Sequence, residues 1–165
     1  MKLYLRPVAF DDCLKIFKWR NNPFLLSFSS SQKTVEWEEH TRWFKNSIDS
    51  DKTIIYIINY DGKDIGQVRF DKQNEQIWVI SVYVIQEFTG QGIGVHAIKI
   101  GCKKIFKKFE NCEIISCVRN DNLRAHYAFI KAGFIEKQIK GFCPEKHFKF
   151  SKSSKIKKHN YDCFN

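Results

Sequence analysis

Three glycines at alternate positions give this sequence its clearest chemical signal. Gly90, Gly92 and Gly94 follow an apolar run and precede a segment with helical periodicity. Glycine lets the backbone approach a ligand closely, and the first N–H groups of a helix have no internal partner. With the helix dipole they form an anion site that suits a pyrophosphate. The spacing matches neither a Walker A loop nor the Rossmann G-x-G-x-x-G pattern, and a turn that only allows tight packing stays the alternative.

A second segment supports the interpretation of the glycine turn as a binding site. Residues 122–134 read N-x-x-A-x-x-A-F-x-x-A-G-F and follow a predicted strand. This segment resembles motif B of the GNAT acyl-CoA N-acyltransferases, and the glycine turn resembles their motif A, [Q/R]-x-x-G-x-[G/A]. The two motifs stand in the family's order and spacing, and the resemblance covers residues 3 to about 140.

The resemblance implies a fold, a co-substrate and a set of binding residues. The fold is one α/β domain whose mixed sheet of about seven strands splays between residues 77–85 and 113–118. Acetyl-CoA, or another short acyl-CoA, would lie in that gap, with no metal. Its pantetheine arm would meet backbone groups, and its pyrophosphate would meet the glycine turn. The implied cofactor residues are Val82, Tyr83, Val84, Thr89, Gly90, Gln91, Gly92, Ile93, Gly94, Val95, Asn122 and Phe129.

Two positions depart from the family pattern. Thr89 stands where the motif usually has Gln or Arg, but the phosphate contacts there are mainly to backbone. Phe129 stands where the family's usual general acid is a tyrosine, and a phenyl ring cannot protonate a thiolate. Tyr127, His126 or a water molecule would then supply the proton, and Tyr127 leaves the helix on a different side from Phe129.

The first half resembles a narrower group within the family. Residues 19–23, 39–44 and 65–70 look like enzymes that acylate amino groups of nucleotide-linked deoxy-amino sugars, of the pseudaminic acid pathway type. Ribosomal-protein alanine acetyltransferases have somewhat similar first halves. Arginine forks suit diphosphates, and an aromatic ring can stack on a base. The expected substrate-binding residues are Arg20, Asn21, His40, Trp43 and Arg69.

Each acceptor residue also has a structural interpretation. Trp43 can belong to the apolar face of its helix, and Arg69 can form an ion pair within the sheet. His40 can be a general base, because an imidazole titrates near neutral pH, or a hydrogen-bonded residue of a helix face. Both interpretations of His40 stay open at this level.

The periodicity predicts the elements that must position these residues. Helices are expected at 9–19, 35–48, 93–109 and 122–132, with Thr34 capping the second, and a loop at 20–31. Strands are expected at 2–6, 53–60, 65–70, 77–85, 113–118, 134–139 and 147–150, with an Asp61-Gly62 hairpin turn. The order predicts a mixed sheet with helices on both faces.

Composition limits the classes of protein. The 165 residues are 43% hydrophobic with 15 Phe, which suits one globular domain and not a disordered chain. No apolar run approaches a membrane span and no signal peptide is visible, so a cytoplasmic protein is expected. The six cysteines lack metal-site spacing and are expected to be free thiols.

The charge is unevenly distributed. The chain carries a net charge of +10, and residues 137–165 hold eight lysines against Glu145 and Asp162. A basic balance suits phosphorylated cofactors and nucleotide-linked substrates. Residues 1–150 are expected to form the catalytic domain and 151–165 a solvated, lysine-rich tail.

The leading hypothesis is an acyl-CoA-dependent N-acetyltransferase that acts on a nucleotide-linked amino sugar. The alternatives are acetylation of a peptide N-terminus or small amine, and a GNAT-like domain that binds acyl-CoA without catalysis. No nucleic-acid-binding motif in the sequence supports a nucleic-acid-binding module. The expected partners are small molecules, with no nucleic acid and no membrane, and a homodimer stays open.

Overall fold

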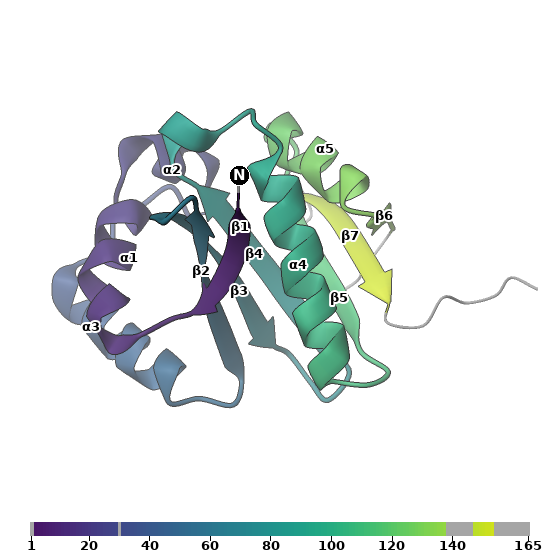
Figure 1. Ribbon diagram of the computed structural model, residues 1–165, viewed down its shortest axis with the longest axis horizontal. Helices are drawn as coiled ribbons and strands as arrows, with labels where there is room; N and C mark the ends of the chain where they lie inside the picture. The colour runs from purple at the N-terminus through teal and green to yellow at the C-terminus, as the bar shows by residue number, and fades with distance from the viewer. Residues whose placement is uncertain (1, 30, 138–146, 154–165) are drawn as a thin grey trace, which may run out of the picture.

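The computed structural model describes residues 2–29, 31–137 and 147–153. Two short 3₁₀ turns, Phe10–Asp12 and Gln86–Phe88, accompany the main helices and strands (Figure 1). In chain order the main elements are β1 (Leu3–Pro7), α1 (Cys13–Arg20), α2 (Pro23–Phe28), α3 (Trp37–Ile48), β2 (Thr53–Tyr60), β3 (Lys63–Lys72), β4 (Ile77–Val84), α4 (Ile93–Lys108), β5 (Glu113–Arg119), α5 (Leu123–Lys131), β6 (Ile135–Glu136) and β7 (His147–Ser153).

All seven of these strands join one mixed sheet in the order β1-β2-β3-β4-β5-β7-β6. The first four strands form an antiparallel meander, and the Asp61-Gly62 turn connects β2 to β3. Strands β4 and β5 are parallel, with α4 as the crossover between them. β7 returns antiparallel between β5 and β6. The predicted fold class is therefore confirmed.

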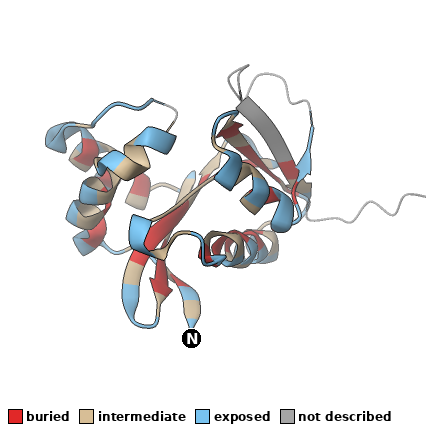
Figure 2. Ribbon diagram, turned by 90° about the horizontal axis from the view of Figure 1, so that it is seen from above, coloured by how far each residue is buried: buried red, intermediate tan, exposed pale blue. Residues whose placement is uncertain are grey.

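Alternation along β2 builds a separate core on each face of the sheet. Ile55 and Ile57 pack with Ile16 of α1 and Phe44 of α3. Ile58 instead joins the larger cluster, which includes Ala97 and other residues of α4 and α5. Successive side chains of a strand point to opposite faces, so one strand supplies both cores. Figure 2 shows the helices on both sides of the sheet, as predicted.

Several predicted boundaries need correction. The expected loop at 20–31 contains helix α2, which begins with Pro23 behind the N-cap Asn22. Thr34 is not a cap, because α3 begins at Trp37 with Glu36 as its N-cap residue. β6 is only two residues long, and part of the strand predicted at 134–139 lies outside the described residues. β7 extends to Ser153, three residues past the strand expected at 147–150.

The prediction of free cysteines holds for three of the described thiols and fails for a fourth. Cys13, Cys102 and Cys112 are free, and the latter two are buried. Cys117 of β5 is disulfide-bonded. Spacing along the chain carries no information on such a bond, because the contact is made in three dimensions. Among the described residues no helix is long and apolar enough to cross a membrane.

A partly buried ion network, in which Asp12 is the buried member, connects the N-terminal segment to the sheet. Arg6 of β1 donates to both carboxylate oxygens of Asp12 at 2.7 Å and to Asp64 of β3 at 2.5 Å. Lys15 of α1 reaches Asp64 at 2.6 Å. Burial raises the pKa of Asp12, but hydrogen bonds from Arg6, the Ala9 amide and Lys15 outweigh it and lower the pKa to about 2.

This network predicts how stability responds to acid. Because its pKa is lowered, the Asp12 carboxylate stabilises the fold above about pH 4 and stops doing so as pH falls through about 2. Its contribution is on the order of 2 kcal/mol. Asp12→Asn should therefore lower the free energy of unfolding at pH 7 and flatten its decline between pH 5 and pH 2, as measured by urea unfolding. Asp11→Asn is the control, and equal pH slopes in all three proteins would contradict this role.

Candidate active site

The site begins where β4 and β5 part. The two parallel strands pair only over Ile77–Val79 against Glu113–Ile115. Beyond Val79, β4 stays paired with β3 up to Val84, and β5 stays paired with β7 up to Arg119. The facing edges of two central strands are thus left open in the middle of the sheet, as the resemblance implied.

The open edge of β4 offers alternate backbone groups. The Ile85 amide donates to Ile65 of β3 at 2.8 Å, while the Glu113 amide donates to Gln76 at 2.7 Å. Because hydrogen-bonding direction alternates along a strand, the backbone groups of Val82 and Val84 face the gap. Those of Tyr83 face β3. Contrary to expectation, the Tyr83 backbone is therefore turned away from the gap, whereas the expected groups of Val82 and Val84 are open to a ligand.

The glycine turn lies at the end of this edge. Gly90 and Gly92 have φ of 80° and 75°, a left-handed conformation that favours glycine. Gly92 is the N-cap of α4. The helix's first internal bond from a backbone amide is His96 to Gly92, at 3.2 Å, so the amides of Ile93–Val95 precede it. Nothing lies within 4 Å of a Cβ built on Gly94, which leaves room for an anion above these amides.

The opposite wall comes from α5. The side-chain oxygen of Asn122 caps this helix by accepting from the Ala125 amide at 3.1 Å, which leaves its NH₂ group for a ligand. Phe129 lies on the buried face of α5, with its ring edge-on to Phe134. Tyr127 is 59% exposed at the rim, so its position does not support a role as the acid.

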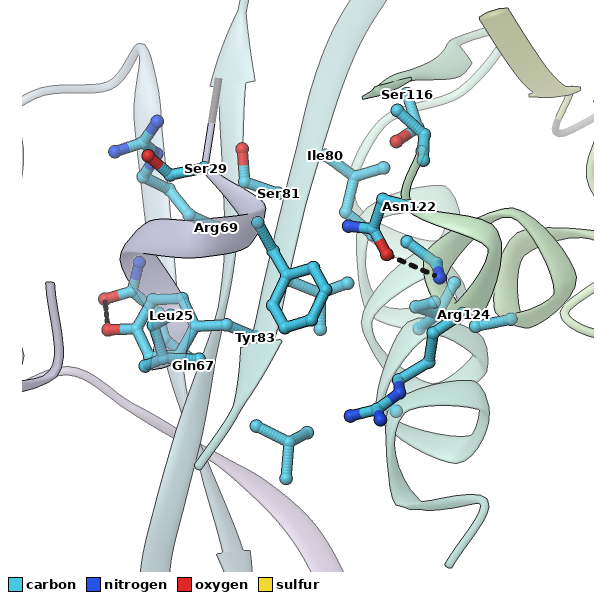
Figure 3. Close-up of a pocket in the computed structure, with 18 of the residues that line it drawn as sticks. Leu25, Ser29, Gln67, Arg69, Ile80, Ser81, Tyr83, Ser116, Asn122 and Arg124 are labelled. Atoms are coloured by element: carbon cyan, nitrogen blue, oxygen red, sulfur yellow. Dashed lines mark hydrogen bonds between the residues drawn. The ribbon is translucent and has the colours of Figure 1, made fainter. Parts of the chain in front are cut away.

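One cavity of about 900 Å³ joins both walls to the first half of the chain. Figure 3 shows Gln67, Arg69 and Ser81 on one side, with Asn122 and Arg124 on the other. Of the predicted cofactor residues, Gln91 does not line the cavity; its side chain donates to the Glu87 carbonyl at 3.3 Å. Those that do are Val82, Tyr83, Val84, Thr89, Gly90, Gly92, Ile93, Gly94, Val95, Asn122 and Phe129.

The predicted acceptor residues divide into two groups. Arg20 lines the cavity, and its Nη2 donates to the Ser31 hydroxyl at 2.9 Å, while its Nη1 is buried with no hydrogen-bond partner among the described residues. Such an unsatisfied cationic donor suits an anionic ligand. Asn21 does not line the cavity. Its amide bonds the backbone N–H and carbonyl of Val35, both at 2.8 Å, so the prediction that it binds substrate is corrected to a structural role.

Arg69 and Trp43 form a pair at the cavity wall. The guanidinium of Arg69 lies 5.3 Å from the Trp43 ring centroid and donates to Asp71 at 2.9 Å. The ion pair weighed from the sequence is therefore present. Arg69 covers one face of Trp43, so a nucleobase would have only the other face on which to stack.

His40 is 2% exposed and surrounded by aromatic rings. Its ring stacks on Trp37 and Phe44, and Nε2 lies 3.0 Å from the Cys13 carbonyl, to which it must donate. Burial lowers the pKa of His40; the Cys13 carbonyl opposes this and Arg20 reinforces it. The lowered pKa favours the neutral ring, in which only Nδ1 can accept a proton. These contacts favour the structural interpretation, in which His40 packs α3 on α1.

Cations dominate the cavity. Its lining contains one carboxylate, Glu39, among the described residues. Sequence reasoning missed Arg119, Arg124 and Lys131, because only the fold brings β5 and α5 beside the first half of the chain. It considered only the backbone of Tyr83, whose side-chain hydroxyl donates to Gln67 at 3.4 Å. The lining cations are Arg20, Arg69, Arg119, Arg124 and Lys131.

Comparison with known proteins agrees with this geometry. A model of the acetyltransferase (GNAT) domain family matches residues 2–135. This chain belongs to the GNAT acetyltransferase family. The membership confirms the predicted family. In the part of the chain that the structure describes, no three acidic, His or Cys side chains gather to hold a metal ion.

Two curated relatives match part of their length. An uncharacterized protein of Methanocaldococcus jannaschii is 26% identical over 136 residues, which are 81% of this chain and 28% of that protein. The acetyltransferase PseH of Campylobacter jejuni is 29% identical over 77 residues, or 47% of this chain and 48% of PseH. This GNAT chain thus spans less than half of either relative.

Solved structures share the fold at low identity. A domain from M. jannaschii is 22% identical with a TM-score of 0.79, over 92% of this chain and 98% of that one. The aminoglycoside acetyltransferase AAC(6')-Ib in complex with coenzyme A is 17% identical with a TM-score of 0.78, over 92% and 95%. Spermidine N-acetyltransferase from Vibrio cholerae is 16% identical with a TM-score of 0.77, over 92% and 95%.

The glycine turn predicts one effect on cofactor binding. Gly94 lacks a positive φ and has free space around it, so Gly94→Val should fold but fill the volume expected for the pyrophosphate. Acetyl-CoA affinity should fall by about tenfold or more, which is ~1.4 kcal/mol, as measured by calorimetry. Thermal unfolding checks the fold, and normal affinity in a folded variant would place the cofactor elsewhere.

The surroundings of His40 predict an unchanged pH profile. Gln in its place can still donate to the Cys13 carbonyl. We expect kcat/KM of His40→Gln to fall at acidic pH as it does in the wild type, because a structural His40 does not titrate as the base and another group causes that fall. Loss of that fall at acidic pH, together with a decrease in rate on the order of a hundredfold, would identify His40 as the general base.

Proposed function

We propose that this GNAT enzyme transfers an acetyl, or another short acyl, group from acyl-CoA to the amino group of a nucleotide-linked deoxy-amino sugar. One observation carries the proposal. The open β4 edge and the glycine turn share a single cavity with a cationic acceptor end that includes the unpaired Nη1 of Arg20. The partial likeness to PseH and the resemblance of the first half to enzymes of the pseudaminic acid type support it.

The proposed donor half follows from open backbone groups. The pantetheine arm would add to the edge of β4 through Val82 and Val84, with Asn122 donating from α5. The pyrophosphate would accept from the amides of Ile93–Val95. A thioester bound along the β4 edge would place its carbonyl oxygen near fixed backbone N–H donors. These donors would stabilise the negative charge that develops on the oxygen as the amine attacks.

The chemistry asks little of side chains. A neutral amine attacks the thioester carbonyl carbon, the C–S bond breaks, and the amine loses a proton to water. Phe129 cannot protonate the departing thiolate, so water supplies that proton in our proposal. Holding the two substrates together then contributes much of the rate.

The positive charge of the cavity also favours an anionic acceptor over a cationic one. Polyamines and aminoglycosides are polycations. Asp71 and Asp121 pair with Arg69 and Arg119, but Arg20, Arg124 and Lys131 outnumber Glu39 in the lining and would repel a polycation. A diphosphate-linked sugar has the opposite charge and can accept from Arg20 or Arg69. An amino group on the sugar would then reach the thioester as its nucleotide part binds the arginines.

A panel of acceptors tests the proposal. Thiol release from acetyl-CoA is followed with UDP- and dTDP-linked 3- and 4-amino sugars, the free amino sugars, spermidine and an N-terminal peptide. We expect kcat/KM to be highest for a nucleotide-linked sugar, and Arg20→Ala to reduce that preference. Turnover of spermidine or peptide alone would reject the substrate class, and acetyl-CoA binding with no turnover would favour a non-catalytic domain.

Phe129 supplies a further prediction. If protonation of the thiolate does not limit the rate, Phe129→Tyr should change kcat by less than about tenfold, well below the hundredfold that a general acid can provide. Tyr127→Phe should be equally silent. Steady-state kinetics of the two variants checks this, and a hundredfold gain in Phe129→Tyr would show that sulfur protonation is the slow step.

A further inference from the structure

Helix α2 is an excursion with little packing of its own. None of its six residues is buried. The loop that contains it is closed at its base by the two Asn21–Val35 hydrogen bonds. From this base the chain crosses to the cavity, where Phe24, Leu25 and Phe28 line the wall. Something other than a hydrophobic core must therefore keep α2 in place.

Arg119 supplies one attachment from the opposite wall of the cavity. This residue ends β5, and its Nη1 donates to the carbonyls of Ser27 and Ser29, both at 3.1 Å. Those carbonyls lie at the C-terminal end of α2, where helix carbonyls lack internal partners. Asp121 accepts from Nε of Arg119 at 3.0 Å and also pairs with its Nη2, which fixes the guanidinium plane.

Arg124 supplies a second attachment from α5. Its guanidinium carbon lies 5.8 Å from the ring centroids of both Phe24 and Phe28. The two rings pack edge-on at 5.2 Å, one turn apart on α2, and so form a single aromatic surface for the cation. In Figure 3, Arg124 reaches from α5 into the space between the two walls.

We propose that Arg119 and Arg124 are positioning residues that hold α2 as a roof over the acceptor end of the cavity. Both residues belong to β5 and α5 on the proposed acyl-CoA side of the cavity, whereas α2 belongs to the acceptor side. The shape of the acceptor site thus depends on residues of the opposite side. This inference rests on the proposed function for its substrate class, but the attachment of α2 itself does not.

The roof has two expected effects on the reaction. It contributes Leu25 and the two phenylalanines to the acceptor's surroundings, so loosening it should weaken acceptor binding. It also covers the thioester, so loosening it should admit water and raise hydrolysis of acetyl-CoA when no acceptor is present. Neither effect requires a change at the glycine turn.

The test compares Arg119→Ala, Arg119→Lys and Arg124→Ala with Arg42→Ala. Arg42 is an exposed arginine of α3 outside the cavity lining, and its variant controls for loss of surface charge, while Arg119→Lys keeps the charge inside the cavity. Hydrogen–deuterium exchange of the peptide that contains α2 reports the attachment without any acceptor. Calorimetry with acetyl-CoA, steady-state kinetics and acceptor-free thiol release report the consequences, and thermal unfolding checks each fold.

We expect exchange in α2 to be about tenfold faster in both alanine variants, with Arg119→Lys partly restored and Arg42→Ala unchanged. The acceptor KM should rise about tenfold while acetyl-CoA affinity changes less than about twofold. Unchanged exchange in α2, or equal losses for acceptor and cofactor, would overturn the proposal. Arg124→Ala alters only an exposed side chain, so it decides the matter if Arg119→Ala unfolds. If no nucleotide-linked sugar is acetylated but exchange in α2 still rises in the alanine variants, the proposed substrate class is rejected and the attachment of α2 by Arg119 and Arg124 stands.

Discussion

The parting of β4 from β5 after Val79 is the constraint on which the site depends. Backbone N–H and carbonyl groups inside a protein must find hydrogen-bond partners, and two central strands that separate leave theirs open. Each strand remains paired on its other edge, β4 with β3 and β5 with β7, so neither can close the gap by itself. An extended ligand with its own amides, such as the proposed pantetheine arm, would pair with the open edge of β4.

The rest of the fold holds this opening rigid. The core of α1, α3 and β2 supports the acceptor side, and the larger core of α4 and α5 supports the cofactor side. The network of Arg6, Asp12 and Asp64 ties the N-terminal strand and the first helix to β3. The cavity therefore lies between two braced halves, and α2 is the weakly packed segment that bridges them.

Sequence reasoning predicted what local patterns encode. Periodicity identified the strands and long helices, and the glycine spacing with Asn122 predicted where the cofactor half should lie. It could not show that Asn21 would bond Val35, or that Nε2 of His40 would be committed to Cys13, because these partners are distant in sequence. It read 20–31 as a loop because Asn and Ser residues obscure a six-residue helix. Arg119 and Arg124 were missed because their role depends on a contact between the two halves.

The most direct test is a crystal structure of this GNAT chain with coenzyme A. The account predicts the pantetheine arm between the Val82–Val84 edge of β4 and Asn122, with the pyrophosphate on the amides of Ile93–Val95 and the sulfur directed toward the cationic end of the cavity. Coenzyme A bound outside the gap between β4 and β5, with these backbone groups unengaged, would contradict the account.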